Sequence, residues 1–230
     1  AAAADLERQA QLRLQQPPPT PPQPEAPVGG NRQVVDAVDL VFAIDTTASM
    51  GPVIDELAAS MRSIIRILNQ LVPSVRVGVA AYTDADTGLP PLQVMPLRSA
   101  NRDLPQIIAF VDALNESPIG SGTLEEDVHL GLGAATAMSF RPDALQSVVL
   151  IGDAQAHPEY VEESLYRIRA FVAGSDRRSV SALFVATPSA LRDGLRSRGY
   201  FAAVAQAGGG AFSEYAGSMI AGVLLSVLVD

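Results

Sequence analysis

The sequence predicts an α/β fold in which helices cover both faces of a doubly wound, mostly parallel sheet. From residue 37 onwards, short apolar segments alternate with longer amphipathic ones, the order typical of repeated strand–helix–strand units. The segment "AVDLVFAI" at 37–44 is apolar at nearly every position, as expected of a strand that is buried on both faces. In sheets of this kind, ligands bind beyond the carboxyl ends of the strands.

The individual elements follow from the spacing of the apolar residues. The strongest helix has apolar side chains at helical spacing from Val53 to Leu71, with Pro52 in its first turn. Pro96 places the strand 92–97 at an edge of the sheet, because proline has no N–H for a second neighbour. The other strands are expected at 37–44, 74–82, 147–152 and 179–186, the other helices near 103–114, 125–138, 159–173, 189–207 and 219–229, and a turn at 206–212 before a last strand.

The chain divides into an N-terminal tail with a proline-rich linker, residues 1–36, and one domain at 37–230. The stretch "PPPTPPQPEAP" at 17–27 holds seven of the 17 prolines and is expected to be extended. Such a segment serves either as a spacer that holds a domain away from an anchor or neighbour, or as a tail without a role of its own.

Composition removes several classes of function. The net charge is −9 and the 16 basic residues are unclustered, which argues against nucleic acid and anionic membranes as partners. The absence of cysteine excludes disulfides, thiolate catalysis and zinc–thiolate sites, and no apolar run reaches the length of about 18 residues that a membrane span needs. The first residue is alanine, so we expect that an upstream segment such as a secretion signal was removed, which favours an extracytoplasmic location.

Three acidic residues lie just beyond buried strands, two of them directly after the strand. Asp45 follows 37–44, Asp84 follows 74–82, and Asp153 follows 147–152. Because parallel strands end at the same edge of a sheet, we expect these carboxylates to lie close together, where they repel one another unless a cation or protons intervene. Thr47 and Ser49 alternate with Asp45 along one loop, and such oxygen ligands suit Mg²⁺, Mn²⁺ or Ca²⁺.

Structural roles account for each of these residues taken singly. Thr47 or Ser49 could cap the helix that begins near Met50, and Asp153 could be a turn residue after its strand. It is the combination of Asp-x-Thr-x-Ser with a second aspartate after a strand that favours a cation site.

Three motifs in order carry a family resemblance. "DLVFAIDTTASM" at 39–50 resembles the first motif of the metal-ion-dependent adhesion site of von Willebrand factor A-type (VWA) domains. "GSGTLEED" at 120–127 resembles the middle loop of the family, and "VVLIGDAQAHP" at 148–158 resembles the last motif as it occurs in bacterial members. The resemblance covers about residues 37–229 and implies a Rossmann-like sheet with one antiparallel edge strand. It also implies that the metal is held by Asp45, Thr47, Ser49, Thr123 and Asp153.

The same resemblance implies a function. VWA domains bind Mg²⁺ or Mn²⁺ and use it to grip an Asp or Glu side chain of a partner protein, so we expect an adhesion or assembly module and not an enzyme. Two alternatives stay open, a metal-assisted phosphatase or hydrolase that uses Asp45 and His157 at the same edge, and a structural domain with an empty site. For His157 itself a loop or capping role is favoured, and for His129 a packing or surface role.

Overall fold

The computed structural model describes residues 35–85, 88–114, 123–192 and 196–215. Several predicted features lie outside these residues: the tail and linker up to residue 34, the first part of the middle-loop motif at 120–122, and the helix at 219–229.

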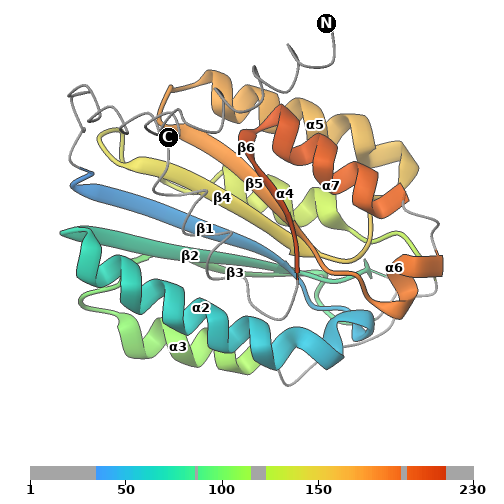
Figure 1. Cartoon of the computed structure of the whole chain (residues 1–230), viewed down its shortest axis with the longest axis horizontal. Coiled ribbons are helices and arrows are strands. Elements are labelled where there is room, and N and C mark those ends of the chain that lie inside the picture. Colours follow the sequence, from blue (N-terminus) through green and yellow to red (C-terminus); the bar gives the residue numbers. More distant parts are fainter. Residues whose placement is uncertain (1–34, 86–87, 115–122, 193–195, 216–230) are drawn as a thin grey trace, which may run out of the picture. The chain divides into compact units, whose positions relative to one another are not determined.

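The described residues form a six-stranded sheet with helices on both faces (Figure 1). Its strands are β1 Ala37–Asp45, β2 Ser74–Tyr82, β3 Leu92–Ser99, β4 Leu145–Gly152, β5 Arg178–Phe184 and β6 Gly209–Glu214. The order is β3-β2-β1-β4-β5-β6, and all neighbours are parallel except β2 and β3. The predicted α/β architecture, with an antiparallel strand at one edge, is therefore confirmed.

The helices form two layers, one on each face of the sheet, so that the central strand β1 is covered on both sides (Figure 1). They are η1 Ala48–Met50, α2 Gly51–Leu71, α3 Leu104–Ala113, α4 Val128–Thr136, α5 Pro158–Ala173, α6 Pro188–Arg192 and α7 Arg196–Ala207. Along β1, Phe42 and Ile44 belong to the core beneath α2 and α3, whereas Val41 and Ala43 belong to the core beneath α4, α5 and α7. Both sets are buried, which explains the continuous apolar run of this strand. No described helix has the combination of length and hydrophobicity needed to cross a membrane.

Two predicted helices differ from the observed ones. The helix expected near 125–138 begins only at Val128, because Glu126 pairs with Ala156 in an isolated parallel bridge and its N–H bonds to the Gln155 carbonyl at 3.0 Å. In the region expected to form one helix near 189–207, the structure describes two helices, α6 and α7, and residues 193–195 between them lie outside the described residues.

The turn expected at 206–212 is wrong in its second half, where β6 already begins at Gly209 and pairs with β5. The glycines that suggested a turn are needed for close packing instead. A Cβ at Gly208 would lie 2.4 Å from the Val180 side chain, and one at Gly210 would lie 2.5 Å from the Val180 carbonyl oxygen. Gly209 itself has φ +62°, a backbone conformation that favours glycine.

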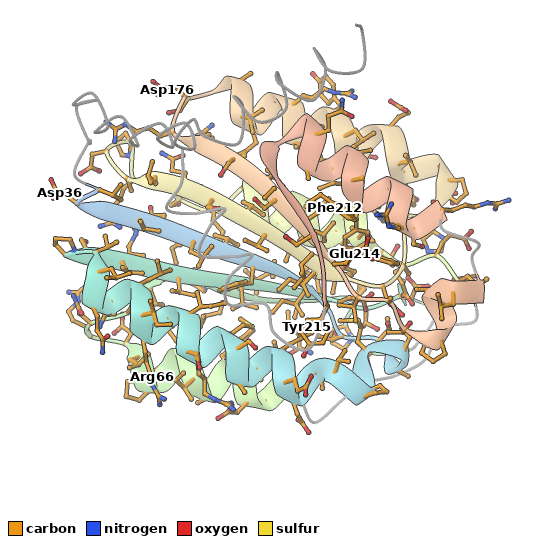
Figure 2. The ribbon with its side chains drawn as sticks, viewed as in Figure 1. Asp36, Arg66, Asp176, Phe212, Glu214 and Tyr215 are labelled. Carbon is orange, nitrogen blue, oxygen red and sulfur yellow. The ribbon has the colours of Figure 1, made fainter. Side chains whose placement is uncertain are left out.

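Glu214 and Tyr215, at the end of β6, are labelled in Figure 2, and their side chains connect this strand to both helical layers. Glu214 accepts a hydrogen bond of 2.7 Å from Nε of Arg198 in α7, and the Tyr215 hydroxyl donates to Glu56 in α2. These contacts fix the last described strand at its edge of the sheet.

A buried ion pair holds the amino-terminal end of the central strand. Asp39 is fully buried, and its Oδ1 accepts from Nε of Arg76 at 2.9 Å and from Nη2 of Arg141 at 2.6 Å. Its Oδ2 accepts from the Arg141 backbone N–H at 2.7 Å. Burial acts to raise the pKa of Asp39, but the hydrogen bonds from the two arginines outweigh it and lower this pKa. Arg141 thereby ties the segment between α4 and β4 to the middle of the sheet.

We expect Asp39→Ala to destabilise the fold by about 3–5 kcal/mol, because it leaves two arginines without their buried partner. The measurement is urea unfolding followed by circular dichroism. The control is Arg62→Ala, which breaks the exposed pair between Arg62 and Asp112 and should cost less than about 1 kcal/mol. Equal losses in the two variants would contradict a central role for Asp39.

Candidate functional site

The first loop of the candidate site turns around the Asp45 carboxylate. β1 ends at Asp45, whose Oδ1 accepts the Thr47 backbone N–H at 2.9 Å and the Thr47 hydroxyl at 2.7 Å. The Thr47 hydroxyl is also 3.1 Å from the Ser49 hydroxyl. Neither η1 nor α2 has a side-chain hydrogen bond at its N-cap, so the capping roles considered for Thr47 and Ser49 are wrong. The hydroxyls face the carboxylates instead.

Asp153 completes this group from the neighbouring strand. β1 and β4 are parallel, with Ile44 opposite Ile151, so the residues after both strands meet at one edge. The Ser49 hydroxyl donates to Asp153 Oδ1 at 3.0 Å. Asp45, Thr47, Ser49 and Asp153 thus form one hydrogen-bonded chain of oxygen atoms at the carboxyl edge of the sheet.

Thr187 is a participant that the motif comparison did not identify. Its hydroxyl donates to Asp153 Oδ2 and accepts the Ala190 backbone N–H at 3.2 Å. Thr187 lies just beyond the strand predicted at 179–186, and the rule that placed Asp45 and Asp153 at the carboxyl edge would have found it. Asp153 is therefore oriented by a hydroxyl on each oxygen.

The electrostatics of this chain favour a cation. Asp45 and Asp153 are almost completely buried. Burial, together with the nearby charge of Asp153, raises the pKa of Asp45 to about 7, and burial also raises the pKa of Asp153. Asp84 adds a smaller contribution to the Asp45 pKa, so all three predicted carboxylates do gather at one edge. A divalent cation between them would offset both the burial and the repulsion.

The residues present fit such an ion. Asp45 Oδ2 is buried and accepts no hydrogen bond from the residues that the structure describes, which leaves it available to a metal. The backbone also approaches closely here, since a Cβ at Gly152 would lie 2.9 Å from the Tyr82 hydroxyl oxygen and 3.0 Å from Asp45 Cβ. Carboxylate and hydroxyl oxygens are ligands suited to Mg²⁺, Mn²⁺ or Ca²⁺.

Thr123, the fifth predicted ligand, lies beside Asp84. Its hydroxyl is 3.1 Å from Asp84 Oδ2 and 2.9 Å from the Glu125 carbonyl oxygen. Thr123 is thus linked to the acidic edge through Asp84, and its role as a ligand stays a prediction.

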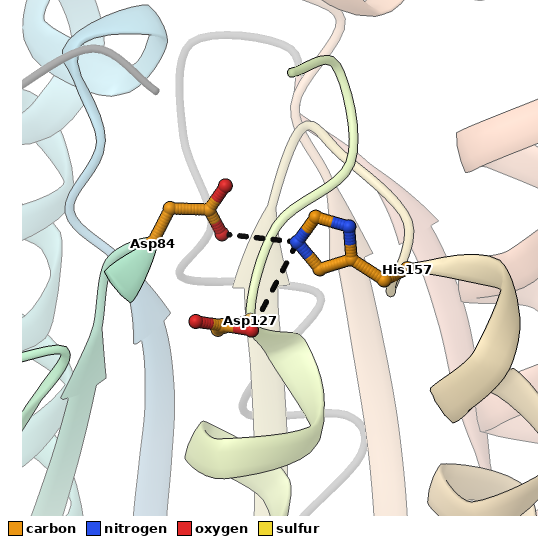
Figure 3. Close-up of side chains that lie close together, drawn as sticks. All are labelled: Asp84, Asp127 and His157. Atoms are coloured by element: carbon orange, nitrogen blue, oxygen red, sulfur yellow. Dashed lines mark ion pairs between the residues drawn. The ribbon is translucent and has the colours of Figure 1, made fainter. Parts of the chain in front are cut away.

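A second polar cluster lies next to the first. Asp84, Asp127 and His157 line a pocket of about 250 Å³ together with Thr123 and Tyr160, among others. His157 is the N-cap residue of α5, as a capping role requires, but its side chain makes no cap hydrogen bond and faces the two carboxylates (Figure 3).

His129 packs against α5, in agreement with its predicted role. Its ring stacks on Tyr160 with centroids 3.9 Å apart, and burial lowers its pKa.

Comparison with known proteins identifies the family. The model of the von Willebrand factor type A domain matches residues 39–192. The chain belongs to this family. The match begins on the central strand and includes every predicted metal ligand.

The chain is similar to the alpha-protein kinase vwkA of Dictyostelium discoideum, with 25% identity over 125 residues. This match covers 53% of the chain but 19% of the kinase. The similarity therefore concerns a small part of that protein.

Solved structures share the fold at low sequence identity. BatB from Bacteroides thetaiotaomicron has a TM-score of 0.58 and 15% identity, with 82% of this chain and 95% of BatB covered. The pilus adhesin SpaC from Lactobacillus rhamnosus GG has a TM-score of 0.58 and 13% sequence identity, and the match covers 82% of this chain and 29% of SpaC. Proximal thread matrix protein 1 of the mussel byssus was solved with a zinc-occupied metal-ion-dependent adhesion site (MIDAS). It has a TM-score of 0.58 and 15% sequence identity, and the match covers 86% of this chain and 46% of that protein.

The raised pKa of Asp45 predicts how stability without metal depends on pH. Between about pH 4 and pH 7 the folded chain keeps a proton that the unfolded chain has lost, so rising pH in this window lowers the free energy of unfolding. Asp45→Asn has no such proton. With a chelator present, we expect the variant to gain stability relative to wild type from pH 5 to pH 8, by up to about 1.4 kcal/mol per pH unit.

The measurement is denaturant unfolding at several pH values, with Asp112→Asn as a control at a half-exposed carboxylate. Parallel pH profiles for wild type and Asp45→Asn would show that Asp45 keeps its ordinary pKa.

Proposed function

We propose that this chain is a metal-dependent protein-binding module, and not an enzyme, which grips an acidic side chain of a partner through a divalent cation. The proposal is carried by the chain Asp45–Thr47–Ser49–Asp153, in which Asp45 Oδ2 accepts no hydrogen bond from the described residues. Mg²⁺ is the proposed ion, with Mn²⁺ or Ca²⁺ as alternatives, because the donor set consists of oxygen atoms.

The residues around the ion have distinct tasks. Asp45 and Asp153 supply the negative charge that attracts a cation, and the Thr47 and Ser49 hydroxyls are oriented by these carboxylates at 2.7 Å and 3.0 Å. Thr123, whose hydroxyl lies 3.1 Å from Asp84 Oδ2, is the proposed fifth ligand. When bound, the cation supplies an electrophilic position for a carboxylate that comes from outside.

The location of the site supports binding of a partner. Ser49 is only partly buried, unlike Asp45 and Thr47, so the chain of oxygens reaches the surface at this residue. An acidic side chain of a partner would compensate the positive charge of the ion there, which uncharged groups would do less well. Among the similar structures, one belongs to a pilus adhesin and another has zinc in its MIDAS. Both are compatible with a binding role.

Isothermal titration with MgCl₂ and MnCl₂ tests metal binding. We expect saturable binding to the wild type and its loss in Asp45→Ala, because this variant removes the oriented carboxylate. Ser49→Ala should weaken binding, whereas Ser63→Ala should leave it unchanged, since the Ser63 hydroxyl bonds only to the Ala59 carbonyl within α2. No response to either ion in the wild type would reject the site.

Partner chemistry is tested with immobilised peptides that carry a central Glu, compared with the same peptides carrying Gln. We expect retention of the protein on the Glu peptides in Mg²⁺ and release by a chelator. Turnover of p-nitrophenyl phosphate in Mg²⁺, lost in Asp45→Ala, would instead support the phosphatase alternative.

A further inference from the structure

The pocket beside the first site brings together three side chains of types that can bind metals, from three separate segments (Figure 3). Asp84 follows β2, Asp127 precedes α4, and His157 precedes α5. One ligand atom of each lies within 4.8 Å of the other two. None of the three belongs to the set Asp45, Thr47, Ser49, Thr123 and Asp153, so the cluster is a different group of ligands.

The distances in this cluster suit coordination better than hydrogen bonding. His157 Nε2 is 3.4 Å from Asp84 Oδ1 and 3.9 Å from Asp127 Oδ1, whereas a nitrogen–oxygen hydrogen bond to a carboxylate is about 2.7–2.9 Å long. Ligands about 2.1 Å from a tetrahedral zinc ion are about 3.4 Å apart. The His157–Asp84 distance already matches this value, and the other ligand atoms, which lie within 4.8 Å of one another, would have to move closer together to hold a cation.

Each carboxylate is oriented by its other oxygen. Asp127 Oδ2 accepts the Ala85 backbone N–H at 3.0 Å, and Asp84 Oδ2 lies 3.1 Å from the Thr123 hydroxyl. These bonds direct Oδ1 of both residues toward His157. Such outer hydrogen bonds are what fixes ligands in metal sites.

Burial and charge add an independent reason for an ion here. The Asp84 side chain is 4% exposed and the Asp127 side chain 11%, while His157, at 22%, is the most accessible of the three. Buried carboxylates at this spacing are stabilised by a cation, and the His157 ring lies within 4 Å of both of them. The pocket of about 250 Å³ leaves an opening through which an ion and a further ligand can enter.

We propose that Asp84, Asp127 and His157 form a second cation site, selective for a transition ion of the Zn²⁺ class. The imidazole nitrogen distinguishes it from the oxygen-only first site, since nitrogen ligands favour Zn²⁺ over Mg²⁺. Three protein ligands leave one position open toward the pocket, next to Tyr160 and Glu159. An ion at this position ties the segment after β2 to those that precede α4 and α5.

The two histidines of the chain allow a site-specific test. Wild-type protein in saturating Mg²⁺ is titrated with ZnCl₂ while the ring ¹⁵N resonances of His129 and His157 are followed by NMR. We expect the His157 Nε2 resonance to shift and saturate at one equivalent, with His129 changing much less. No response of His157 up to millimolar zinc, or equal responses of both rings, would overturn the proposal.

Variants link the response to the named ligands. His157→Gln and Asp127→Asn should each weaken zinc binding by at least about 100-fold, because loss of an outer partner alone costs about 10–100-fold. If circular dichroism shows that Asp127→Asn does not fold, Asp84→Asn takes its place, with the same expected loss of zinc affinity. The matched control is His129→Gln, which removes the other imidazole near Asp127 and should leave the affinity unchanged.

A further variant separates the two sites. Ser49→Ala, in the first site, should keep the His157 response. Zinc binding that disappears in Ser49→Ala but persists in His157→Gln would assign the ion to the first site and overturn the proposal.

Discussion

The fold places a buried carboxylate at the carboxyl end of its central strand, and the organisation of the site follows from this constraint. Asp45 is completely buried between two parallel neighbours, where water cannot stabilise its charge. The hydroxyl and the backbone N–H of Thr47 donate hydrogen bonds to this carboxylate, while Asp153 and Asp84 add negative charge nearby. An ion from solution is the group that would complete this arrangement.

Each end of β1 carries a buried carboxylate, but the two are stabilised in different ways. Asp39 and Asp45 are both fully buried on one strand. Asp39 has its counter-charges within the protein, Arg76 and Arg141, and its pKa is lowered. Asp45 has hydroxyl partners and acidic neighbours, and its pKa is raised to about 7. The same strand thus carries a structural ion pair at one end and the proposed cation site at the other.

The second polar cluster, formed by Asp84, Asp127 and His157, lies at the same edge of the sheet. The hydrogen bond between Asp84 and Thr123 connects this cluster to the first group of ligands, and His157 adds a nitrogen ligand that the first group lacks. Two sites with different donor atoms at one sheet edge would allow two different ions to act on the same loops. One would contact a partner, and the other would hold the segments that frame the contact surface.

The sequence by itself determined the sheet, its parallel strands and the meeting of Asp45 and Asp153 at one edge, because these depend on local patterns. The apolar run at 37–44 requires burial on both faces, and an aspartate directly after a parallel strand must emerge at the carboxyl edge. Only the tertiary structure decided the remaining features. It showed that β6 begins among the glycines at 208–210, because they pack against Val180, and that α4 starts late, because Glu126 pairs with Ala156. It also brought His157 to Asp84 and Asp127, which are separated along the chain by up to 73 residues. Sequence periodicity reports which face of an element is buried, whereas contacts between distant loops depend on how the finished layers pack.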